Sequence, residues 1–467
     1  MAEHRKILVI GAGFSGVALA IQLLKRTTAQ VVLVERSGVF GRGVAYAAHG
    51  EANVLNVRAS RMSALACALS HFTDWLAANA PKDADPNGFP RRPTYGAYLS
   101  DTLRTEAAGA PGRFVRRAGQ AVALEAHAGG VTVRLDSGAE LAADAAVLAM
   151  GNFAPSTPAG AEGAVGEARY IECSWTQGAF DDVGRDEDVI LLGSGLTAVD
   201  ALLELEAKGW RGRATVVSRR GLLPHAHDAA QIHAASEAPA RARLSYLVNV
   251  VRSRCATTPW GQVMDELRPH GQLFWTRMSL EERRRFLRHL RPWWDIHRHR
   301  IAPDVAMKLA RLQAEGRLDV VAGKLISAKD ESGSMTLTLR PRGRKTTRML
   351  SAPWLVNCTG PEMDVTRTAD PLLAQLFGAG VARADDLKLG VDVDASLRVH
   401  DAFGRIQPRL FAIGPMTRGA FWETVAVPDI RVQALSLADT IAAMDADRDA
   451  IADAEFEHDD PSAEFRL

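Results

Sequence analysis

The chain has few cysteines, almost no surplus of charge and no long apolar segment. Its 467 residues include four cysteines, and 56 Lys and Arg face 55 Asp and Glu. The near-zero net charge excludes a global attraction to nucleic acid or to an anionic membrane. No apolar run reaches the roughly 18 residues of a membrane-spanning helix, and none before the first strand resembles a signal peptide. We therefore expect a cytoplasmic protein that binds neither a membrane nor nucleic acid.

The cysteines are also too far apart to act together along the sequence. None forms a C-x-x-C motif, and none has the spacing of metal ligands, so we expect no metal site. Each thiol is expected to be buried and reduced. Flavin enzymes that reduce disulfides usually carry a closely spaced cysteine pair, so this absence argues against that class. The four residues are Cys67, Cys173, Cys255 and Cys358.

The N-terminal segment "KILVIGAGFSGVALAIQLL" has the pattern of a strand, a glycine turn and a helix. The first glycine allows the tight turn, the second lets the backbone approach a pyrophosphate, and the third lets helix and strand pack closely. Glu35 ends the next strand, about 20 residues on, where an acid hydrogen-bonds a ribose diol. A turn that binds nothing is the alternative. The predicted contacts to this first nucleotide are Gly11, Gly13, Phe14, Ser15, Gly16, Glu35 and Arg36.

A second unit of the same kind covers Val189 to Gly221, "VILLGSGLTAVDALLELEAKGWRGRATVVSRRG". Its strand ends in Arg219 and Arg220 where the first unit has an acid. A guanidinium binds a 2′-phosphate through charge-assisted bonds, which favours NADPH at this site. Alternatively, the arginines only solvate the end of a strand. The predicted contacts are Gly193, Ser194, Gly195, Leu196, Thr197, Ser218, Arg219 and Arg220.

Further glycines indicate that the first unit holds FAD rather than NAD. "GRGVAY" follows the acidic strand and offers a second backbone approach to a two-phosphate flavin at Arg42 and Gly43. Buried strands end at Gly151 and Gly360, and a late strand ends at Gly414, before a helix that begins around Pro428. These glycines are the expected points where backbone meets cofactor or crosses between domains.

The chain resembles the bacterial FAD/NAD(P)-binding proteins, which are flavoproteins with two dinucleotide-binding domains. The resemblance is carried by "GAGFSGVALA", "GRGVAY", "LNVRASRMSAL", "GSGLTAVDALL", "SRRGLLPHAH", "RPWWDIHRHRIAP" and "IGPMTRGAFWETVAVPDIR". It implies an α/β fold with two Rossmann-like domains, the NADPH domain being inserted in the FAD domain. The implied boundaries are 1–155 and 360–445 for the FAD domain, 156–359 for the NADPH domain with a helical insertion at about 225–316, and 446–467 for an acidic tail.

The resemblance also suggests which loops surround the flavin ring. It places Asn53, Asn56, Arg58, Ser60 and Arg61 near the isoalloxazine, as flavin or nicotinamide contacts, although such polar residues can also simply hold a loop together. Many such flavoproteins have an Asp after the glycine of the late turn, whereas Gly414 is followed by Pro415. Backbone N–H groups or Asp429 would then replace that Asp at the ribityl chain. Further expected contacts from these loops are Met62 and Ile430.

The segment "RPWWDIHRHR" concentrates aromatic and basic residues in ten positions. A metal site is disfavoured, because two histidines two apart on a helix point away from each other. We expect a packed aromatic helix with an interdomain salt bridge, and an anion-binding role for Arg298 or Arg300 stays open. The sequence does not assign a role to Trp293, Trp294, His297 or His299.

The expected function is that of an FAD-dependent, NADPH-consuming monooxygenase that uses O2 on a small-molecule substrate, with an amine nitrogen as one target. The domain order resembles that of amine N-hydroxylases and related class B flavin monooxygenases. Those enzymes often have a His before the second glycine turn, whereas this chain has "YIECSW". One alternative is an FAD reductase or dehydrogenase that passes electrons to a quinone, a protein or a small acceptor. Another is a non-enzymatic flavin-binding scaffold. Catalytic residues, substrate and oligomeric state are not assigned.

Overall fold

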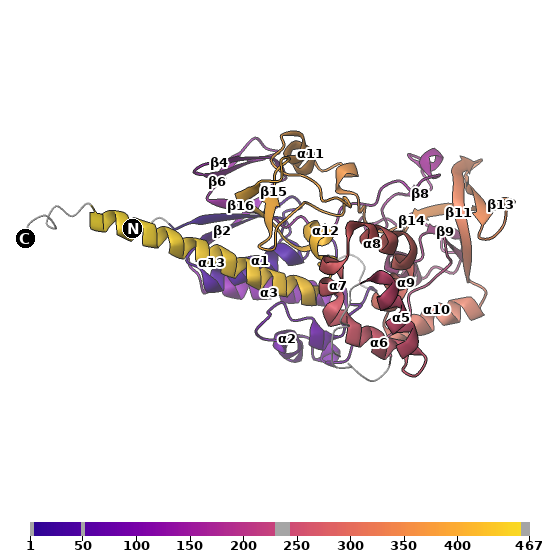
Figure 1. Ribbon diagram of the computed structural model, residues 1–467. Helices are drawn as coiled ribbons and strands as arrows, with labels where there is room; N and C mark the ends of the chain where they lie inside the picture. The colour runs from indigo at the N-terminus through magenta and orange to yellow at the C-terminus, as the bar shows by residue number, and fades with distance from the viewer. Residues whose placement is uncertain (1–3, 48–51, 229–242, 459–467) are drawn as a thin grey trace, which may run out of the picture.

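The protein is described by a computed structural model that covers residues 4–47, 52–228 and 243–458 (Figure 1). The first of its two large sheets has the strand order β15-β16-β7-β1-β2-β3. All neighbours are parallel except the edge strand β15, which runs antiparallel to β16. The strands are β1 (Lys6–Ile10), β2 (Gln30–Glu35), β3 (Phe114–Ala118), β7 (Ala145–Leu148), β15 (Arg398–His400) and β16 (Ile406–Ala412).

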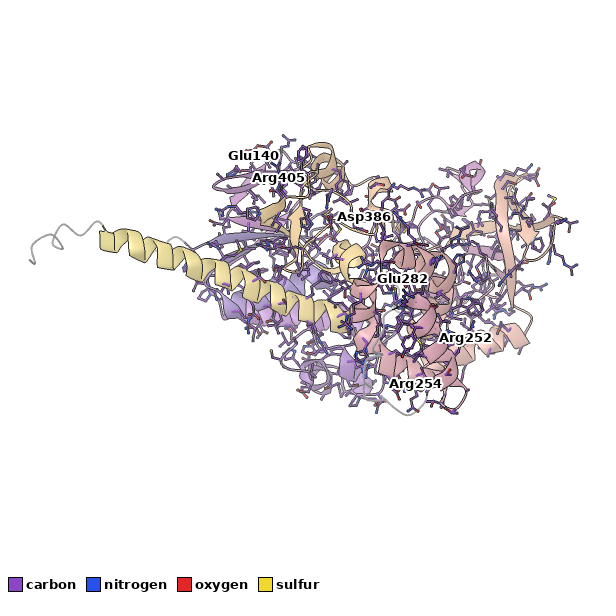
Figure 2. The ribbon with its side chains drawn as sticks, in the orientation of Figure 1. Glu140, Arg252, Arg254, Glu282, Asp386 and Arg405 are labelled. Atoms are coloured by element: carbon purple, nitrogen blue, oxygen red, sulfur yellow. The ribbon has the colours of Figure 1, made fainter. Side chains whose placement is uncertain are left out.

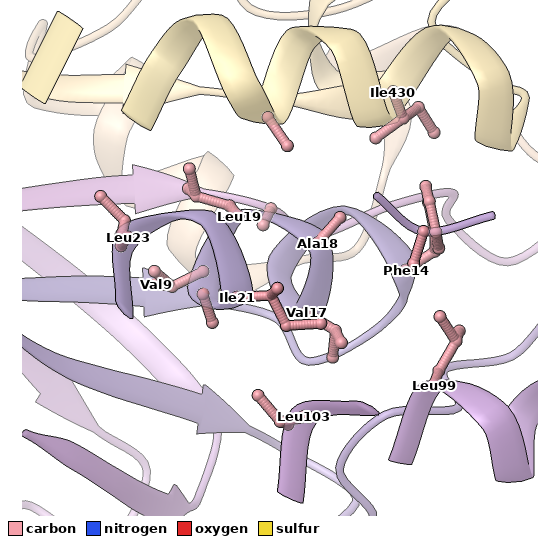
Figure 3. Packing of buried hydrophobic residues seen from close by; sticks show 14 of the residues in the cluster. Val9, Phe14, Val17, Ala18, Leu19, Ile21, Leu23, Leu99, Leu103 and Ile430 are labelled. Atoms are coloured by element: carbon pink, nitrogen blue, oxygen red, sulfur yellow. The ribbon is translucent and has the colours of Figure 1, made fainter. Parts of the chain in front are cut away.

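This sheet is covered on both faces, as a parallel sheet requires. Helix α1 (Phe14–Arg26) packs between α3 (Arg92–Ala108) and α13 (Val427–His458), and Figure 3 shows the interlocking side chains of these helices and β1. Eleven consecutive residues of α1, Phe14 to Leu24, are buried, so this helix has no solvent face over most of its length. The other face carries α11 (Pro371–Gly378) and the small sheet of β4 (Ala121–His127), β5 (Gly130–Leu135) and β6 (Glu140–Ala143).

The second large sheet has the order β13-β12-β11-β10-β9-β14-β8, and the five strands from β11 to β8 are parallel. All of its strands lie in the chain between β7 and β15 of the first sheet. The second sheet with its helices, here called the second unit, is therefore inserted in the first sheet with its helices, the first unit, which confirms the predicted α/β fold. The exact domain boundaries stay a prediction. The strands are β8 (Tyr170–Ile171), β9 (Val189–Leu192), β10 (Ala214–Ser218), β11 (Leu318–Glu331), β12 (Ser334–Pro341), β13 (Arg348–Ala352) and β14 (Trp354–Asn357).

Short helices follow β10, as expected for the helical insertion. The sequence predicts a capping box, because Glu282 follows Ser279 by three residues. The structure confirms it, since Ser279 and Glu282 exchange side-chain and backbone bonds at the start of α8; Figure 2 shows Glu282 in this helical layer. The layer comprises α5 (Leu244–Cys255), α6 (Trp260–Leu267), α7 (Gly271–Arg277), α8 (Leu280–Arg285), α9 (Arg291–Arg298) and α10 (Pro303–Ala314).

The sequence pattern of the helical insertion predicts continuous helices over 258–278 and over 279–300, and this expectation is wrong because both helices are interrupted. The helix expected over 279–300 contains a π-helical turn at Phe286–Leu290, just before Pro292 in the first turn of α9. The helix expected over 258–278 contains a 3₁₀ turn at Arg268–His270 around Pro269. Proline has no N–H to donate and its ring displaces the carbonyl four residues back, so the regular ladder is broken at both places.

The C-terminal helix α13 begins at Val427, which confirms the helix expected around Pro428. It packs along α1 and then runs past the body of the molecule as a single long rod (Figure 1). The predicted acidic tail over 446–467 is helical up to His458, and 459–467 lie outside the described residues.

The prediction that every thiol is buried is wrong for two cysteines. Cys358 is buried, whereas Cys67 and Cys255 are exposed, because they lie in a loop and in the last turn of the exposed helix α5. None of the four is disulfide-bonded. Within the described ranges, no helix combines the length and the apolar character needed to cross a bilayer.

Candidate nucleotide-binding sites

The first glycine turn joins β1 to α1 at the carboxyl end of the parallel strands. Gly11 has φ +107°, and a Cβ there would overlap the carbonyl oxygen of Ala149. A Cβ on Gly16 would overlap the Gly11 carbonyl, so the helix and the turn touch through backbone atoms. A Cβ on Gly43 would come within 2.9 Å of the Gly13 Cα. The loop that begins at Phe40 and Gly41 therefore closes directly over the turn.

The N-terminus of α1 has free hydrogen-bonding capacity. No side chain caps it and no acidic residue lies in its first turn, so its leading N–H groups and the helix dipole favour an anion. The Glu35 carboxylate accepts the N–H of Ala12 at 2.8 Å and both the N–H and the hydroxyl of Ser37, at 3.0 and 2.8 Å. These bonds fix the acid beside the turn, at the place where a ribose diol is expected.

The second glycine turn repeats this geometry between β9 and α4 (Leu196–Ala207). Gly193 has φ +111°, and a Cβ there would overlap the carbonyl oxygen of Cys358. The N-terminus of α4 has no side-chain cap and no acid in its first turn. In contrast to Gly13, a Cβ built on Gly195 meets nothing within 4 Å. The second turn is therefore open where the first is covered.

Two serines connect the second turn to the end of β10. The hydroxyl of Ser194 lies 2.9 Å from that of Ser218 and donates to the Leu222 carbonyl at 2.6 Å. Ser218 also accepts the N–H of Gly221 at 3.0 Å. These bonds join the turn to the end of the strand, and the binding of an adenosine ribose and its substituent there stays a prediction.

The two arginines after β10 have different surroundings. Arg219 is exposed and has no hydrogen-bond or ion-pair partner in the described part of the chain. Arg220 donates to the His289 carbonyl at 3.4 Å, and its guanidinium lies 5.9 Å from the Trp293 ring centroid. Arg219 is therefore the freer cation for a phosphate. The backbone of Arg342 reaches the same edge, since its N–H donates to Ala322, the β-partner of Ser218.

The crossover glycines lie where the sequence placed them. Gly151 and Gly360 follow β7 and β14 with φ +71° and +84°, and a Cβ on either meets nothing within 4 Å. At Gly414, φ is +72° and a Cβ would overlap the Ser15 hydroxyl, so the late turn rests on the start of α1. Its N–H donates to Gln433 Oε1 at 2.7 Å.

The structure surrounds Asp429 with cations rather than leaving it free at the late turn. Its carboxylate lies 3.7 Å from Arg298 and 3.8 Å from Arg268. Burial raises the pKa of Asp429, and the two arginines oppose that shift. Its expected contact with a ribityl chain stays a prediction.

The remaining predicted contacts divide into buried and accessible residues. Ile430 and Met62 are 4% and 2% exposed and belong to the core around α1. Arg42 is partly buried next to Gly96 of α3, and Arg36 is exposed. Asn56 accepts a bond from His227 Nε2 at 2.9 Å through its carbonyl. That bond joins the loop between β2 and α3 to the segment after β10, and the spacing of residues in the sequence gives no indication of it.

Ion pairs also join the two units. Arg92 of α3 lies 2.8 Å from Asp200 of α4, and burial raises the pKa of Asp200 while Arg92 opposes it. Arg298 of α9 donates to Glu423 at 2.8 and 3.2 Å, with both side chains almost fully buried. The expected salt-bridge role of the aromatic helix is thus confirmed.

The aromatic side chains of α9 pack against several different neighbours. The His297 ring lies 4.6 Å from His225 and 4.8 Å from Trp260, and its Nδ1 is 2.7 Å from the Trp293 carbonyl. Burial and the surrounding arginines lower the pKa of His299 well below its usual value. Trp293 is exposed below Arg220, and Trp294 packs at the edge of Phe286. In the ranges that the structure describes, no three potential ligands converge to hold a metal ion.

Three side chains with a buried polar atom, two between β2 and α3 and one on α3, have capacity for a ligand. Asn53 Oδ1, Ser60 Oγ and Tyr95 Oη are buried and have no hydrogen-bond partner in the described structure. Such groups are costly unless a ligand or water satisfies them. Together with the uncapped helix and the glycine cradle, they fit a bound dinucleotide.

Comparison with known proteins agrees with this geometry. Residues 8–153 match the model of a family described as FAD-NAD(P)-binding. Over 146 residues the chain is 31% identical to L-aspartate N-monooxygenase (nitrosuccinate-forming) from Streptomyces cremeus, but that match covers 29% of this chain and only 22% of the relative. The curated relative is thus matched over about a fifth of its length.

Solved structures match over nearly the whole chain at low identity. L-lysine 6-monooxygenase from Pseudomonas syringae superposes with a TM-score of 0.65 and 18% identity, covering 94% of this chain and 99% of that one. Ornithine hydroxylase from Pseudomonas aeruginosa gives a TM-score of 0.63 and 16% identity, with coverages of 94% and 99%. The chain therefore has the fold of these two enzymes, and its residues 8–153 are similar to an FAD-NAD(P)-binding domain.

Proposed function

We propose that the chain is an FAD-dependent, NADPH-consuming monooxygenase that hydroxylates the nitrogen of a small amine. The observation that carries this proposal is the pairing of two uncapped glycine turns, one covered and beside an acid, the other open and beside a free arginine. A covered site suits a cofactor that stays bound, and an open one suits a nucleotide that is exchanged. The likeness to amine-hydroxylating enzymes supports the choice of reaction.

The balance of this reaction is simple. One oxygen atom of O2 enters the new N–O bond, the other leaves as water, and NADPH supplies two electrons. Bound FAD would supply the transfer of these electrons and the activation of O2. Glu35 and the first turn would hold its adenosine end. Ser218 and Arg219 would hold the 2′-phosphate side of NADPH.

The chain's own residues would otherwise position the reactants and exclude water. The ion pairs Arg92–Asp200 and Arg298–Glu423 hold the two units together, with Glu423 buried. Burial of the Arg298–Glu423 pair keeps water out of that part of the junction.

The cysteines argue against a disulfide reductase with the same fold. Cys358 follows β14 beside the second turn, and burial raises the pKa of its thiol far above the usual value, with Asp200 and Cys173 adding to the shift. A thiol that stays protonated is a poor nucleophile toward disulfides. The exposed thiols Cys67 and Cys255 lie on separate elements and form no disulfide.

The test of this function measures the fate of the electrons. The purified protein is mixed with NADPH, O2 and a panel of amines, and three quantities are compared: NADPH consumed, hydroxylamine formed and hydrogen peroxide released. We expect an amine that stimulates NADPH oxidation and yields hydroxylamine in near-equal amount. Oxidation that releases only peroxide, or that continues without O2 when a quinone is added, would identify a reductase. A flavin that NADPH does not bleach would identify a scaffold.

A further inference from the structure

A cleft that is partly open to solvent, here called the cavity, lies at the junction of the two units, and the space between its walls, open solvent included, is about 580 Å³. Its walls come from the loop over 56–61, the segment at 227–228 after β10, and the helices α6 and α9 (Figure 1). Of its 12 lining residues, five are arginines and two are aspartates. The lining arginines are Arg58, Arg61, Arg268, Arg298 and Arg300.

Two of these arginines are already neutralised by carboxylates. Arg298 donates to Glu423 through two nitrogens, at 2.8 and 3.2 Å, and forms a buried pair. Arg300 pairs with Asp265, and its guanidinium stands 5.7 Å from the Trp260 ring centroid. These two residues build the wall of the cavity and have little charge left to offer.

The other three have no carboxylate within hydrogen-bond distance in the described structure. Arg58 donates to the backbone carbonyls of Asn87 and Asp228, at 2.7 and 2.6 Å. Arg61 makes no side-chain hydrogen bond or ion pair with any described residue. Arg268 comes no closer to a carboxylate than 3.8 Å from Asp429, and its Nη2 is buried with no hydrogen-bond partner.

The cations also repel one another. Burial lowers the pKa of Arg268 to about 10, and Arg298 and Arg61 add to that shift while Asp429 and Glu423 oppose it. Burial lowers the pKa of Arg61 too, reinforced by Arg298, Arg300 and Arg58 against the opposing effect of Asp265. Unpaired guanidinium groups that are partly removed from water cost free energy, which a bound anion would recover.

We propose that Arg61 and Arg268, with Arg58 beside them, bind the carboxylates of an acidic amine, an amino acid with a second carboxylate. The amino group of this ligand rests on the proposed function, and its carboxylates rest on the arginines of the cavity. Planar guanidinium groups match carboxylates through paired bonds, and more than one such group is without an acidic partner here. Asp228, whose side chain is 52% exposed at the same cavity, is an acceptor for the ammonium group.

A phosphate of NADPH is the other anion whose chemistry suits these arginines. The predicted phosphate-binding residues at the second turn, Arg219 and Arg220, do not line this cavity. Mutation can therefore distinguish a carboxylate ligand from a phosphate ligand, since a substitution in the cavity leaves Arg219 and Arg220 at the second turn intact.

The test measures binding by calorimetry on the flavin-loaded protein. The probes are L-aspartate, succinate, 1,4-diaminobutane, inorganic phosphate and NADP⁺, each titrated into the wild type and into R61Q, R61K and R268Q. R284Q, at an exposed arginine of α8 outside the cavity, is the matched control. We expect L-aspartate and succinate to bind the wild type and R284Q, and 1,4-diaminobutane not to bind.

R61Q and R268Q should weaken the binding of the two dicarboxylates roughly 10-fold or more. R61K should weaken it less, because lysine keeps the positive charge but cannot form the paired bonds of a guanidinium group. The NADP⁺ affinity of these variants should change by less than about 2-fold. If R268Q does not fold, the comparison of R61Q and R61K with the wild type still tests the proposal. The inference is overturned if dicarboxylates do not bind the wild type, if R61Q binds them unchanged, or if R61Q weakens NADP⁺ or phosphate to the same extent.

The outcomes also separate this inference from the proposed function. Arg61-dependent binding of L-aspartate without hydroxylamine from any amine supports the anion site and contradicts the monooxygenase. Hydroxylation of a diamine without dicarboxylate binding contradicts the anion site and supports the monooxygenase.

Discussion

The two glycine turns have nearly the same backbone and differ in what surrounds them. Gly11 and Gly193 have φ of +107° and +111°, and each lies against a carbonyl from the strand beside it. The first turn is covered by Gly43, whereas nothing lies within 4 Å of a Cβ at Gly195. The same supersecondary unit thus yields a covered turn and an open turn, and the difference comes from the loops added around it.

The largest expected effect comes from the same substitution in both turns. An alanine at Gly11 or Gly193 would have to adopt positive φ and overlap a carbonyl, with strain of about 1–3 kcal/mol at each position. We expect G11A to be purified with little flavin, and G193A to keep its flavin but to be reduced poorly by NADPH. Visible absorbance measures the first quantity and anaerobic stopped-flow reduction the second.

A matched control for both substitutions is Gly112→Ala, which has φ +76° and an open Cβ position far from either turn. Melting temperatures show whether flavin loss follows from general unfolding. Equal loss of flavin in G11A and G193A would contradict the assignment of different nucleotides to the two turns.

A smaller effect is expected at the end of β10. Arg219→Ala should raise the KM for NADPH about 10-fold and that for NADH less than about 2-fold, because a charge-assisted bond to the 2′-phosphate is lost. Arg220→Ala should have the weaker effect, since Arg220 is engaged with His289 and Trp293. Steady-state kinetics with both nucleotides test this, and equal changes for NADPH and NADH would refute it.

The acid of the first unit offers a complementary test. Glu35→Gln keeps an oxygen acceptor for the Ala12 N–H but removes its charge. We expect FAD to bind about 5-fold more weakly, a change of about 1 kcal/mol, with unchanged KM for NADPH. Flavin titration of the apoprotein measures the dissociation constant. A change confined to NADPH would assign the two nucleotides the other way round.

The smallest effect concerns the contact that joins the two units. Burial lowers the pKa of His227 to about 4. An unfolded histidine protonates near pH 6.5, so the unfolded state takes up more protons and the stability contributed by His227 is lost as pH falls from 6.5 through 4. Melting temperatures between pH 8 and 4.5 should fall more steeply for the wild type than for His227→Gln, which keeps a donor for Asn56. Parallel curves would contradict this.

Much of the local structure could be predicted from sequence. The glycine turns, the end of β2 at Glu35, the Ser279–Glu282 capping box and the start of α13 depend on neighbouring residues and on their spacing. The interruptions near Pro269 and Pro292 were also local, but helical periodicity outweighed the prolines in the prediction. The exposure of Cys67 and Cys255 was missed because thiol burial depends on the packing of whole elements.

Other features depend on contacts between segments far apart in the chain. Arg219 and Arg220 are neighbours in sequence, yet only Arg220 is held, by residues about 70 positions later. The cavity brings Arg61 together with Arg268 and Arg298, which are more than 200 residues away in sequence. No periodicity or motif relates such positions.

The sequence by itself determined that two strand–glycine–helix units exist and that their neighbouring strands end in residues of opposite charge. Backbone freedom at glycine and the alternation of apolar residues act within about 35 residues, so they are visible in the linear order. Only the tertiary structure decided which turn is covered, which arginine stays free and which cations share one cavity. Those outcomes follow from the packing of the inserted sheet and its helices against the first unit, because burial and charge pairing depend on distance in space.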